Sequence, residues 1–198
     1  MRIGIFGGTF DPIHYGHLVA AEEARAVLAL ERVLIVPAGQ PPHKTKRPIT
    51  AVEHRLVMAQ LAIASNPHFE LSRVDLERPG PHYSVDMVTR LRRQLGPGDI
   101  YFIVGMDSLM ELPTWHEPER LMGLCYIVGV NRPGYHYDLG PLEKAVPGIS
   151  GHIMILEAPQ LEISSHELHD RVRRGLPIKY QVPEAVEEYI QRHKLYVE

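Results

Sequence analysis

Cysteine and tryptophan are nearly absent from this 198-residue sequence, which contains one of each, Cys125 and Trp115. A single cysteine excludes an intramolecular disulfide and favours a reducing compartment, so we expect the cytoplasm. Long apolar runs are missing as well. The first residues, MRIGIFGGTF, break at a glycine pair, and no stretch approaches the roughly 18 uninterrupted apolar residues of a membrane span. We therefore expect neither a signal peptide nor a membrane partner.

An excess of charge of either sign is also lacking. The sequence has 21 Lys and Arg against 24 Asp and Glu, a formal net charge of -3, and no long basic block. Proteins that bind nucleic acids or membrane surfaces generally do so through a cationic field. We therefore expect a small molecule as the partner and no nucleic acid, while a homo-oligomer stays open.

The pattern of apolar residues predicts an α/β protein. Short β-branched runs, the expected strands, occupy 2–6, 32–39, 69–77, 99–107, 125–132 and 152–159. Segments of helical period lie between them at 16–30, 50–65, 84–95, 115–124 and 142–146, and two more follow at 164–175 and 183–195. Strands that are apolar throughout are typical of a parallel sheet covered on both faces. We predict a doubly wound, mostly parallel, Rossmann-like sheet in one domain, residues 1–198, with the C-terminal helices from about 164 packed on it.

The segment GGTFDPIHYGHL, residues 7–18, follows the first expected strand directly. Ligands of doubly wound sheets bind at the carboxyl ends of the strands, where this segment lies. Gly7 and Gly8 lack side chains, so a phosphate can approach the backbone N–H groups, and the next helix adds its positive N-terminal end. The spacing is neither that of a dinucleotide fingerprint nor that of a P-loop. Instead, His14 and His17 face the same space and can each donate a hydrogen bond to a phosphoryl oxygen.

Two other interpretations of the histidine pair remain. An isolated pair three residues apart is more often a packing feature than a site, but its position after a glycine turn at the end of the first strand favours a site. A zinc site needs three or four ligands, and Asp11 is the one nearby candidate. We therefore expect no metal held by protein side chains.

The stretch GGTFDPIHYGH resembles the signature of the nucleotidyltransferase superfamily, whose core is His-x-x-Gly-His. That core alone indicates only the superfamily. The chain is also similar to the bacterial nicotinate-nucleotide adenylyltransferase family over nearly its whole length. The motifs that carry this likeness are PAGQPPHK (37–44), RPGPHYSVDM (78–87), FIVGMDSLMELPTWHEPERL (102–121), VNRPG (130–134), EISS (162–165) and VPEAVEEYI (182–190).

The resemblance implies the reaction of ATP with nicotinate mononucleotide to give nicotinate adenine dinucleotide and pyrophosphate, a step of NAD biosynthesis. The attacking 5′-phosphate is already an anion at neutral pH, so neither a general base nor a covalent intermediate is needed. Catalysis then consists of aligning two anions and stabilising the charge of the departing pyrophosphate. The expected cofactor is Mg²⁺, bound through the ATP phosphates.

The resemblance also implies a role for individual residues. The catalytic pair is His14 and His17. The expected ATP-binding set is Gly7, Gly8, Thr9, Phe10, His14, His17, Gly105, Asp107, Ser164, Ser165 and His169. The expected mononucleotide-binding set is Lys44, Tyr83, Ser84, Val85, Trp115, His116 and Arg132.

Some of these residues have a second interpretation. An aromatic ring at position 115 is expected to stack on the pyridine ring, but it is equally a packing residue. Backbone N–H groups near Ser84 and Trp115 suit a carboxylate. Asp107 at the end of a strand, and Ser164 followed by Glu167, are also typical helix caps.

The segment after Ser165 departs from the family pattern, in which Thr-x-Ile-Arg follows the serines. Here the same positions are His166, Glu167, Leu168 and His169. An imidazole in place of a permanent guanidinium makes the charge offered to ATP depend on pH. We therefore expect ATP binding to weaken as the pH rises above neutrality. Arg173 and Arg174 stay open as compensating charges, whereas Arg171, two residues further on, points elsewhere on the helix.

Alternative functions remain open at this point. The same chemistry on nicotinamide mononucleotide is one, and phosphopantetheine or a phosphorylated alcohol is disfavoured by the Tyr-Ser and Trp motifs. A noncatalytic nucleotide-binding sensor is another, but it is expected to have lost one site histidine. A metallophosphohydrolase is the weakest.

Overall fold

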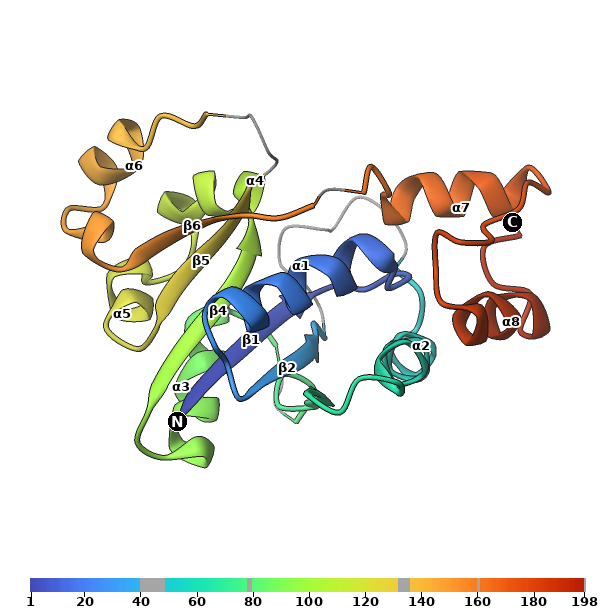
Figure 1. The fold of residues 1–198 in the computed structure, drawn as a ribbon, viewed down its shortest axis with the longest axis horizontal. Coiled ribbons are helices and arrows are strands. Elements are labelled where there is room, and N and C mark those ends of the chain that lie inside the picture. Colours follow the sequence, from blue (N-terminus) through green and yellow to red (C-terminus); the bar gives the residue numbers. More distant parts are fainter. Residues whose placement is uncertain (40–48, 78–79, 132–135, 160, 198) are drawn as a thin grey trace.

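The computed structural model describes residues 1–39, 49–77, 80–131, 136–159 and 161–197. Lys44 and Arg132 lie outside these ranges. The described strands form one sheet of six parallel strands in the order β3-β2-β1-β4-β5-β6, which confirms the predicted doubly wound fold (Figure 1). Their bounds are β1 Arg2–Gly8, β2 Arg32–Pro37, β3 Phe69–Leu71, β4 Asp99–Gly105, β5 Tyr126–Asn131 and β6 Ile153–Glu157.

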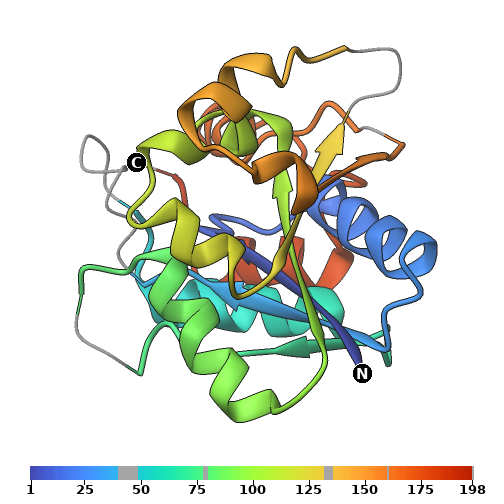
Figure 2. The same ribbon diagram turned by 90° about the vertical axis from the view of Figure 1, so that its left-hand side faces the viewer.

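Helices cover both faces of the sheet. Their bounds are α1 Tyr15–Val27, α2 Val52–Ile63, α3 Ser84–Leu95, α4 Met106–Met110, α5 Pro118–Met122, α6 Gly140–Ala145, α7 Ser165–Arg173 and α8 Glu184–Arg192, with short 3-10 turns η1 Leu112–Thr114 and η2 Ile149–Gly151. Figure 2 shows α1 on one side of the strands and α3 and α5 on the other. Side chains of β1 point alternately to the two faces of the sheet. Ile3 and Ile5 pack with α3 on one face, and Phe6 packs with α1 and α2 on the other.

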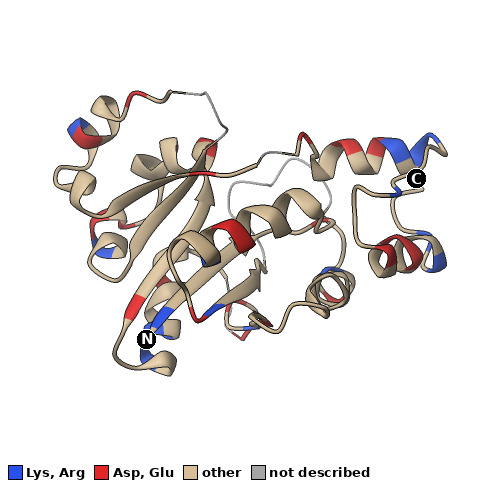
Figure 3. Cartoon of the chain, in the orientation of Figure 1, with Lys and Arg blue, Asp and Glu red and all other residues tan. Residues whose placement is uncertain are grey.

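The C-terminal helices share one of these two layers. Leu168 of α7 and Ile190 of α8 belong to the same buried cluster as Phe6 of the central strand. Figure 3 shows acidic residues near the start of α7 and basic residues at its end, an arrangement that the helix dipole favours. Among the described residues, none of the helices combines the length and the apolar character that crossing a membrane requires.

Several predicted strands, including those expected at 32–39 and 152–159, end earlier than expected, and two of them show the reason. The strand expected at 69–77 is only Phe69–Leu71, because β3 is an edge strand with one neighbour and the chain turns at Arg73, whose carbonyl accepts the N–H of Leu76 at 2.8 Å. The strand expected at 99–107 ends at Gly105, since Gly105 is the extended N-cap of α4. The sequence pattern missed α4 because a helix of five residues is too short to show a period.

Candidate active site

A cavity of about 740 Å³ opens at the carboxyl ends of the central strands. Strands β1 and β4 are neighbours there, and β1 continues toward α1 whereas β4 continues toward α4 on the other face. This is the switch point at which doubly wound sheets bind ligands, and the volume suits a nucleotide. The cavity wall brings together most of the expected residues, namely Gly7, Gly8, Thr9, Phe10, His14, His17, Tyr83, Ser84, Gly105, Asp107, Trp115, His116, Ser164 and Ser165.

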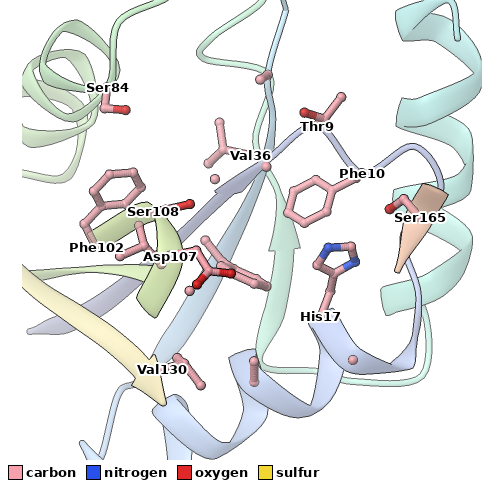
Figure 4. Close-up of a pocket in the computed structure, with 18 of the residues that line it drawn as sticks. Thr9, Phe10, His17, Val36, Ser84, Phe102, Asp107, Ser108, Val130 and Ser165 are labelled. Carbon is pink, nitrogen blue, oxygen red and sulfur yellow. The ribbon is translucent and has the colours of Figure 1, made fainter. Parts of the chain in front are cut away.

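The imidazoles of His14 and His17 form one wall of this cavity as a stacked pair. His14 is the N-cap of α1 and His17 lies in its first turn, so their rings stack with centroids 3.6 Å apart and planes at 24°. The backbone N–H of His14 donates to Nδ1 of His17 at 3.2 Å. Because Nδ1 accepts, the proton of the neutral ring is on Nε2. His17 therefore offers an Nε2–H donor at the positive end of a helix, as Figure 4 shows for its position at the start of α1.

Burial keeps the His14 ring neutral. The residue is only 5% exposed, and burial lowers its pKa from 6.5 to about 4. Among the described residues, no group is hydrogen-bonded to its Nδ1. A buried polar atom of this kind is uncommon in proteins, so its presence beside the cavity sets this ring apart from a packing histidine. The His14 ring is thus an uncharged member of the pair, so the pair is not a fixed double cation.

The residues on either side of the pair explain the spacing of the motif. A Cβ built on Gly16 would lie 3.0 Å from Nδ1 and 3.1 Å from Cε1 of His14, so a side chain at position 16 presses on that ring. On the other side, the ring of Phe10 packs edge-on against that of His17, with centroids 5.1 Å apart. Phe10 in turn lies over Gly8, where an added Cβ would be 2.8 Å from the Phe10 ring. Glycines 8 and 16 therefore make room for the rings that form the wall.

Aromatic side chains line the opposite end of the cavity. The ring of Trp115 packs edge-on against that of Phe102, with centroids 6.0 Å apart, and the ring of Tyr83 stacks on that of His116 at 4.2 Å. Ser84 begins α3, so the positive end of that helix adjoins the same end of the cavity. Figure 4 shows Ser84 and Phe102 on one side of the site, His17 and Phe10 on the other, and Asp107 between them. Val85 is fully buried and is absent from the lining.

Several titratable residues of the wall were not anticipated from the sequence, among them Asp75 and His82. Asp75 is 4% exposed and accepts the backbone N–H of Gly39 at 3.2 Å, and His82 approaches the same glycine so closely that an added Cβ would lie 2.7 Å from its ring. Both line the cavity. Asp75 fell inside an expected strand, and the early end of β3 is what turns it toward the site. Because Asp75 lies four residues beyond Leu71, the last residue of β3, the apolar pattern alone gave no signal of its place in the wall.

His169 makes other contacts than those expected. Its side chain is not among those that line the cavity; its Nε2 donates to the carbonyl oxygen of Asp11 at 2.8 Å, and its ring stacks on that of Tyr196 at 3.8 Å. The reason is geometric, because His169 lies on the side of α7 that faces the β1–α1 turn. The histidine of α7 that does line the cavity is His166. Arg171 bonds to the carbonyl oxygen of Pro177 at 2.9 Å and is likewise absent from the lining.

The two serines before these histidines differ in what they can donate. Ser164 caps α7 by accepting the N–H of Glu167 at 3.1 Å, which confirms the expected cap. Its hydroxyl proton remains available to a ligand, because the oxygen acts there as an acceptor. Ser165 instead uses its hydroxyl proton, donating to the carbonyl oxygen of Pro12 at 3.0 Å.

Comparisons with known proteins agree with this geometry. The model of the family described as cytidylyltransferase-like matches residues 5–171. A protein of Thermomicrobium roseum described as a probable nicotinate-nucleotide adenylyltransferase is 51% identical over 98% of this chain and 91% of its own length. A protein of Thermus thermophilus with the same description is 46% identical over 99% of this chain and 100% of its own.

A solved structure supports the fold independently. The nicotinic acid mononucleotide adenylyltransferase of Plasmodium falciparum, complexed with NaAD, superposes with a TM-score of 0.78 at 21% identity, covering 98% of this chain and 97% of that one. The same protein complexed with APC gives a TM-score of 0.77. This chain belongs to the cytidylyltransferase-like family and, within it, to the nicotinate-nucleotide adenylyltransferases.

Proposed function

We propose that this chain transfers the adenylyl group of ATP to nicotinate mononucleotide, giving nicotinate adenine dinucleotide and pyrophosphate in NAD biosynthesis. The observation that carries the proposal is one cavity with two unlike ends, a stacked histidine pair at the start of α1 and an aromatic wall around Trp115. The first end suits phosphoryl oxygens, and the second suits a flat pyridine ring.

The reaction needs positioning more than it needs proton transfer. An oxygen of the mononucleotide 5′-phosphate forms the new bond to the α-phosphorus, and the bond from that phosphorus to the bridging oxygen breaks, so that pyrophosphate leaves with the electron pair. Nε2–H of His17 donates to the α-phosphate, where negative charge is shared during transfer. His14, held neutral by burial, adds a second ring beside it without repelling a metal ion on the phosphates.

Mg²⁺ is expected to enter with ATP. The described residues contain no group of three or more His, Cys, Asp and Glu placed to hold a metal ion, so the donor set fits a cation carried mainly by phosphate oxygens and water. Of the carboxylates lining the cavity, Asp107 and Glu111 are the ones nearest in sequence to the end of β4. When bound, the ion screens the charge between the two phosphates.

The remaining polar groups divide between the two substrates. Ser164 and His166 suit the outer ATP phosphates, and Asp107 suits a ribose hydroxyl. At the other end, the N-terminus of α3 favours a carboxylate over an uncharged amide, so nicotinate mononucleotide is preferred to nicotinamide mononucleotide. We expect the reaction to take place in the cytoplasm.

An acceptor panel tests the proposed function. The protein is incubated with Mg-ATP and either pyridine mononucleotide, phosphopantetheine or no acceptor, and pyrophosphate release is followed. We expect the fastest release with nicotinate mononucleotide. Preference for nicotinamide mononucleotide would change the acceptor but keep the chemistry, whereas binding of ATP without release on any acceptor would favour a noncatalytic sensor.

A further inference from the structure

The turn between β1 and α1 is hydrogen-bonded to α7, a helix that is far away in the sequence. Asp11 and Pro12, at the centre of the turn, are buried. The carbonyl oxygen of Asp11 accepts a hydrogen bond from His169 at 2.8 Å, and that of Pro12 accepts one from Ser165 at 3.0 Å. The backbone that leads into His14 is therefore fixed by α7 as well as by its own chain neighbours.

The carboxylate of Asp11 has partners of its own, which also come from distant segments. Nε2 of His169 lies 3.7 Å from its Oδ1. Oδ2 of Asp11 accepts the backbone N–H of Thr50 at 3.0 Å, and Oδ1 accepts the hydroxyl of Tyr196 at 2.8 Å. Burial raises the pKa of Asp11, but the hydrogen bonds from His169, Thr50 and Tyr196 outweigh burial and lower it to about 2. The carboxylate is thus ionised at neutral pH, and the bond from the tyrosine is charge-assisted.

Tyr196 reaches this position from the other end of the chain. It is separated from Asp11 by 185 residues, and its ring stacks on that of His169 with centroids 3.8 Å apart. Its backbone φ is +65°, a left-handed conformation that residues other than glycine seldom adopt. Burial and the neighbouring Asp11 charge raise its pKa, so the phenol keeps the proton that it donates. Backbone strain of this kind persists where surrounding contacts hold it.

The shape of the turn decides where the site rings lie. Phe10, directly before Asp11, also has a positive φ of +49°, and it is 2% exposed. Its ring packs edge-on against that of His17 at 5.1 Å. A shift of Asp11 would therefore move Phe10, and through it the ring that donates to the α-phosphate.

We propose that Tyr196 is a positioning residue for adenylyl transfer, whose hydroxyl acts through Asp11 on the orientation of the His14–His17 pair. Tyr196 is not among the residues lining the cavity, so it acts without touching a substrate. This inference rests on the proposed function. It gives the residues that follow α8 a part in catalysis.

The variant Tyr196→Phe tests the proposal, because it removes the hydroxyl and keeps the ring that stacks on His169. We expect kcat to fall about tenfold, while the KM values for ATP and for nicotinate mononucleotide change less than about twofold. Tyr189→Phe is the matched control. Its hydroxyl is hydrogen-bonded to Nδ1 of His54 at 2.9 Å in the same C-terminal layer and does not contact the turn. We expect it to lower the melting temperature without lowering kcat.

A double-mutant cycle with Asp11→Asn identifies the route of the effect. If Tyr196 acts through Asp11, adding Tyr196→Phe to Asp11→Asn lowers kcat little further. Tyr196→Phe alone leaves the buried Asp11 carboxylate with one hydrogen-bond donor fewer, and this can make the single variant unstable. In that case the double variant is compared with Asp11→Asn, because the amide that replaces the carboxylate carries no charge. A further tenfold loss in the double variant would overturn the proposal, as would a Tyr196→Phe enzyme with the kcat of the parent.

A readout that does not depend on turnover separates this proposal from the proposed function. Nitrogen NMR of the histidine rings reports the tautomer and surroundings of His14 and His17 without any substrate. We expect Tyr196→Phe to shift these signals and Tyr189→Phe to leave them in place. A parent protein that releases no pyrophosphate would contradict the function alone, whereas unshifted histidine signals in Tyr196→Phe would contradict the positioning role.

Discussion

Gly16 and His14 fit together so closely that a Cβ added to Gly16 would lie 3.0 Å from Nδ1 of His14. This contact links the backbone of α1 to a ring of the site. Since tight packing leaves no space for a methyl group without a small displacement, a change at position 16 is passed to the imidazole.

The variant Gly16→Ala is therefore expected to lower activity without lowering stability. Alanine is the better helix former, by up to about 1 kcal/mol, which offsets the cost of displacing the His14 ring, so the melting temperature should change little. We expect kcat to fall on the order of tenfold because the His14 ring moves. Gly123→Ala is the control, since an added Cβ there meets its nearest atom, the carbonyl oxygen of Arg120, at 3.5 Å. Equal activity in both variants would mean that the His14 ring has room to adjust.

Removing the donor of His17 should have a larger effect. In His17→Ala the α-phosphate loses the Nε2–H group, and loss of one such donor costs about 10²–10³ in kcat. His68→Ala, at an exposed histidine far from the cavity wall, should keep the parent rate. Pyrophosphate release at saturating substrate measures both. A His17→Ala enzyme within about threefold of the parent would assign the charge stabilisation to other groups.

Much of the fold and the outline of the site follow from the sequence, because they depend on strongly periodic segments. The segment 84–95 is α3 as predicted. The order of strands and helices places Gly8 and Gly105 together at the carboxyl ends of the two neighbouring strands β1 and β4. What the periodicity does not encode is side-chain direction over long distances. His169 lies five residues after the confirmed N-cap of α7, Ser164, yet its ring contacts Asp11 and stacks on Tyr196, and only the folded chain brings these residues together.

The buried His14 ring predicts a pH dependence of stability. Its pKa is about 4 in the folded protein against 6.5 unperturbed, so between these values the unfolded chain binds a proton that the folded chain does not. Stability should therefore be full above pH 6.5 and fall as the pH drops toward 4, by up to about 3 kcal/mol. Asp11, with its pKa lowered from 3.8 to about 2, adds stability that is lost only below pH 3.8, outside this window.

Urea unfolding of the parent and of His14→Asn at several values between about pH 7 and pH 4.5 isolates this contribution, because the other histidines are common to both proteins. The difference in unfolding free energy should shrink steadily as the pH falls. A difference that stays constant over this range would show that the His14 ring titrates normally in the folded protein.

Trp115 supplies an intrinsic probe for the acceptor end of the cavity, since it is the one tryptophan of the chain. Stacking of a pyridine ring on the indole should quench its fluorescence, and the ring lies beside Phe102 rather than beside the histidine pair. We expect titration with nicotinate mononucleotide to quench the emission, and ATP alone to change it far less. Quenching by ATP that matches quenching by the mononucleotide would place the adenine, not the pyridine, against Trp115 and would reverse the assignment of the two ends.

Substitution of the same residue tests the stacking contact by kinetics. Trp115→Phe keeps an aromatic surface and should raise the KM for the mononucleotide severalfold. Trp115→Ala should raise it further, on the order of tenfold, because the stacked contact contributes about 1 kcal/mol beyond the area that it buries. The KM for ATP should stay near the parent value in both variants, because the proposed place of the ATP phosphates is the opposite end of the cavity. An equal rise in both KM values would mean that the indole supports the cavity as a whole rather than the acceptor ring alone.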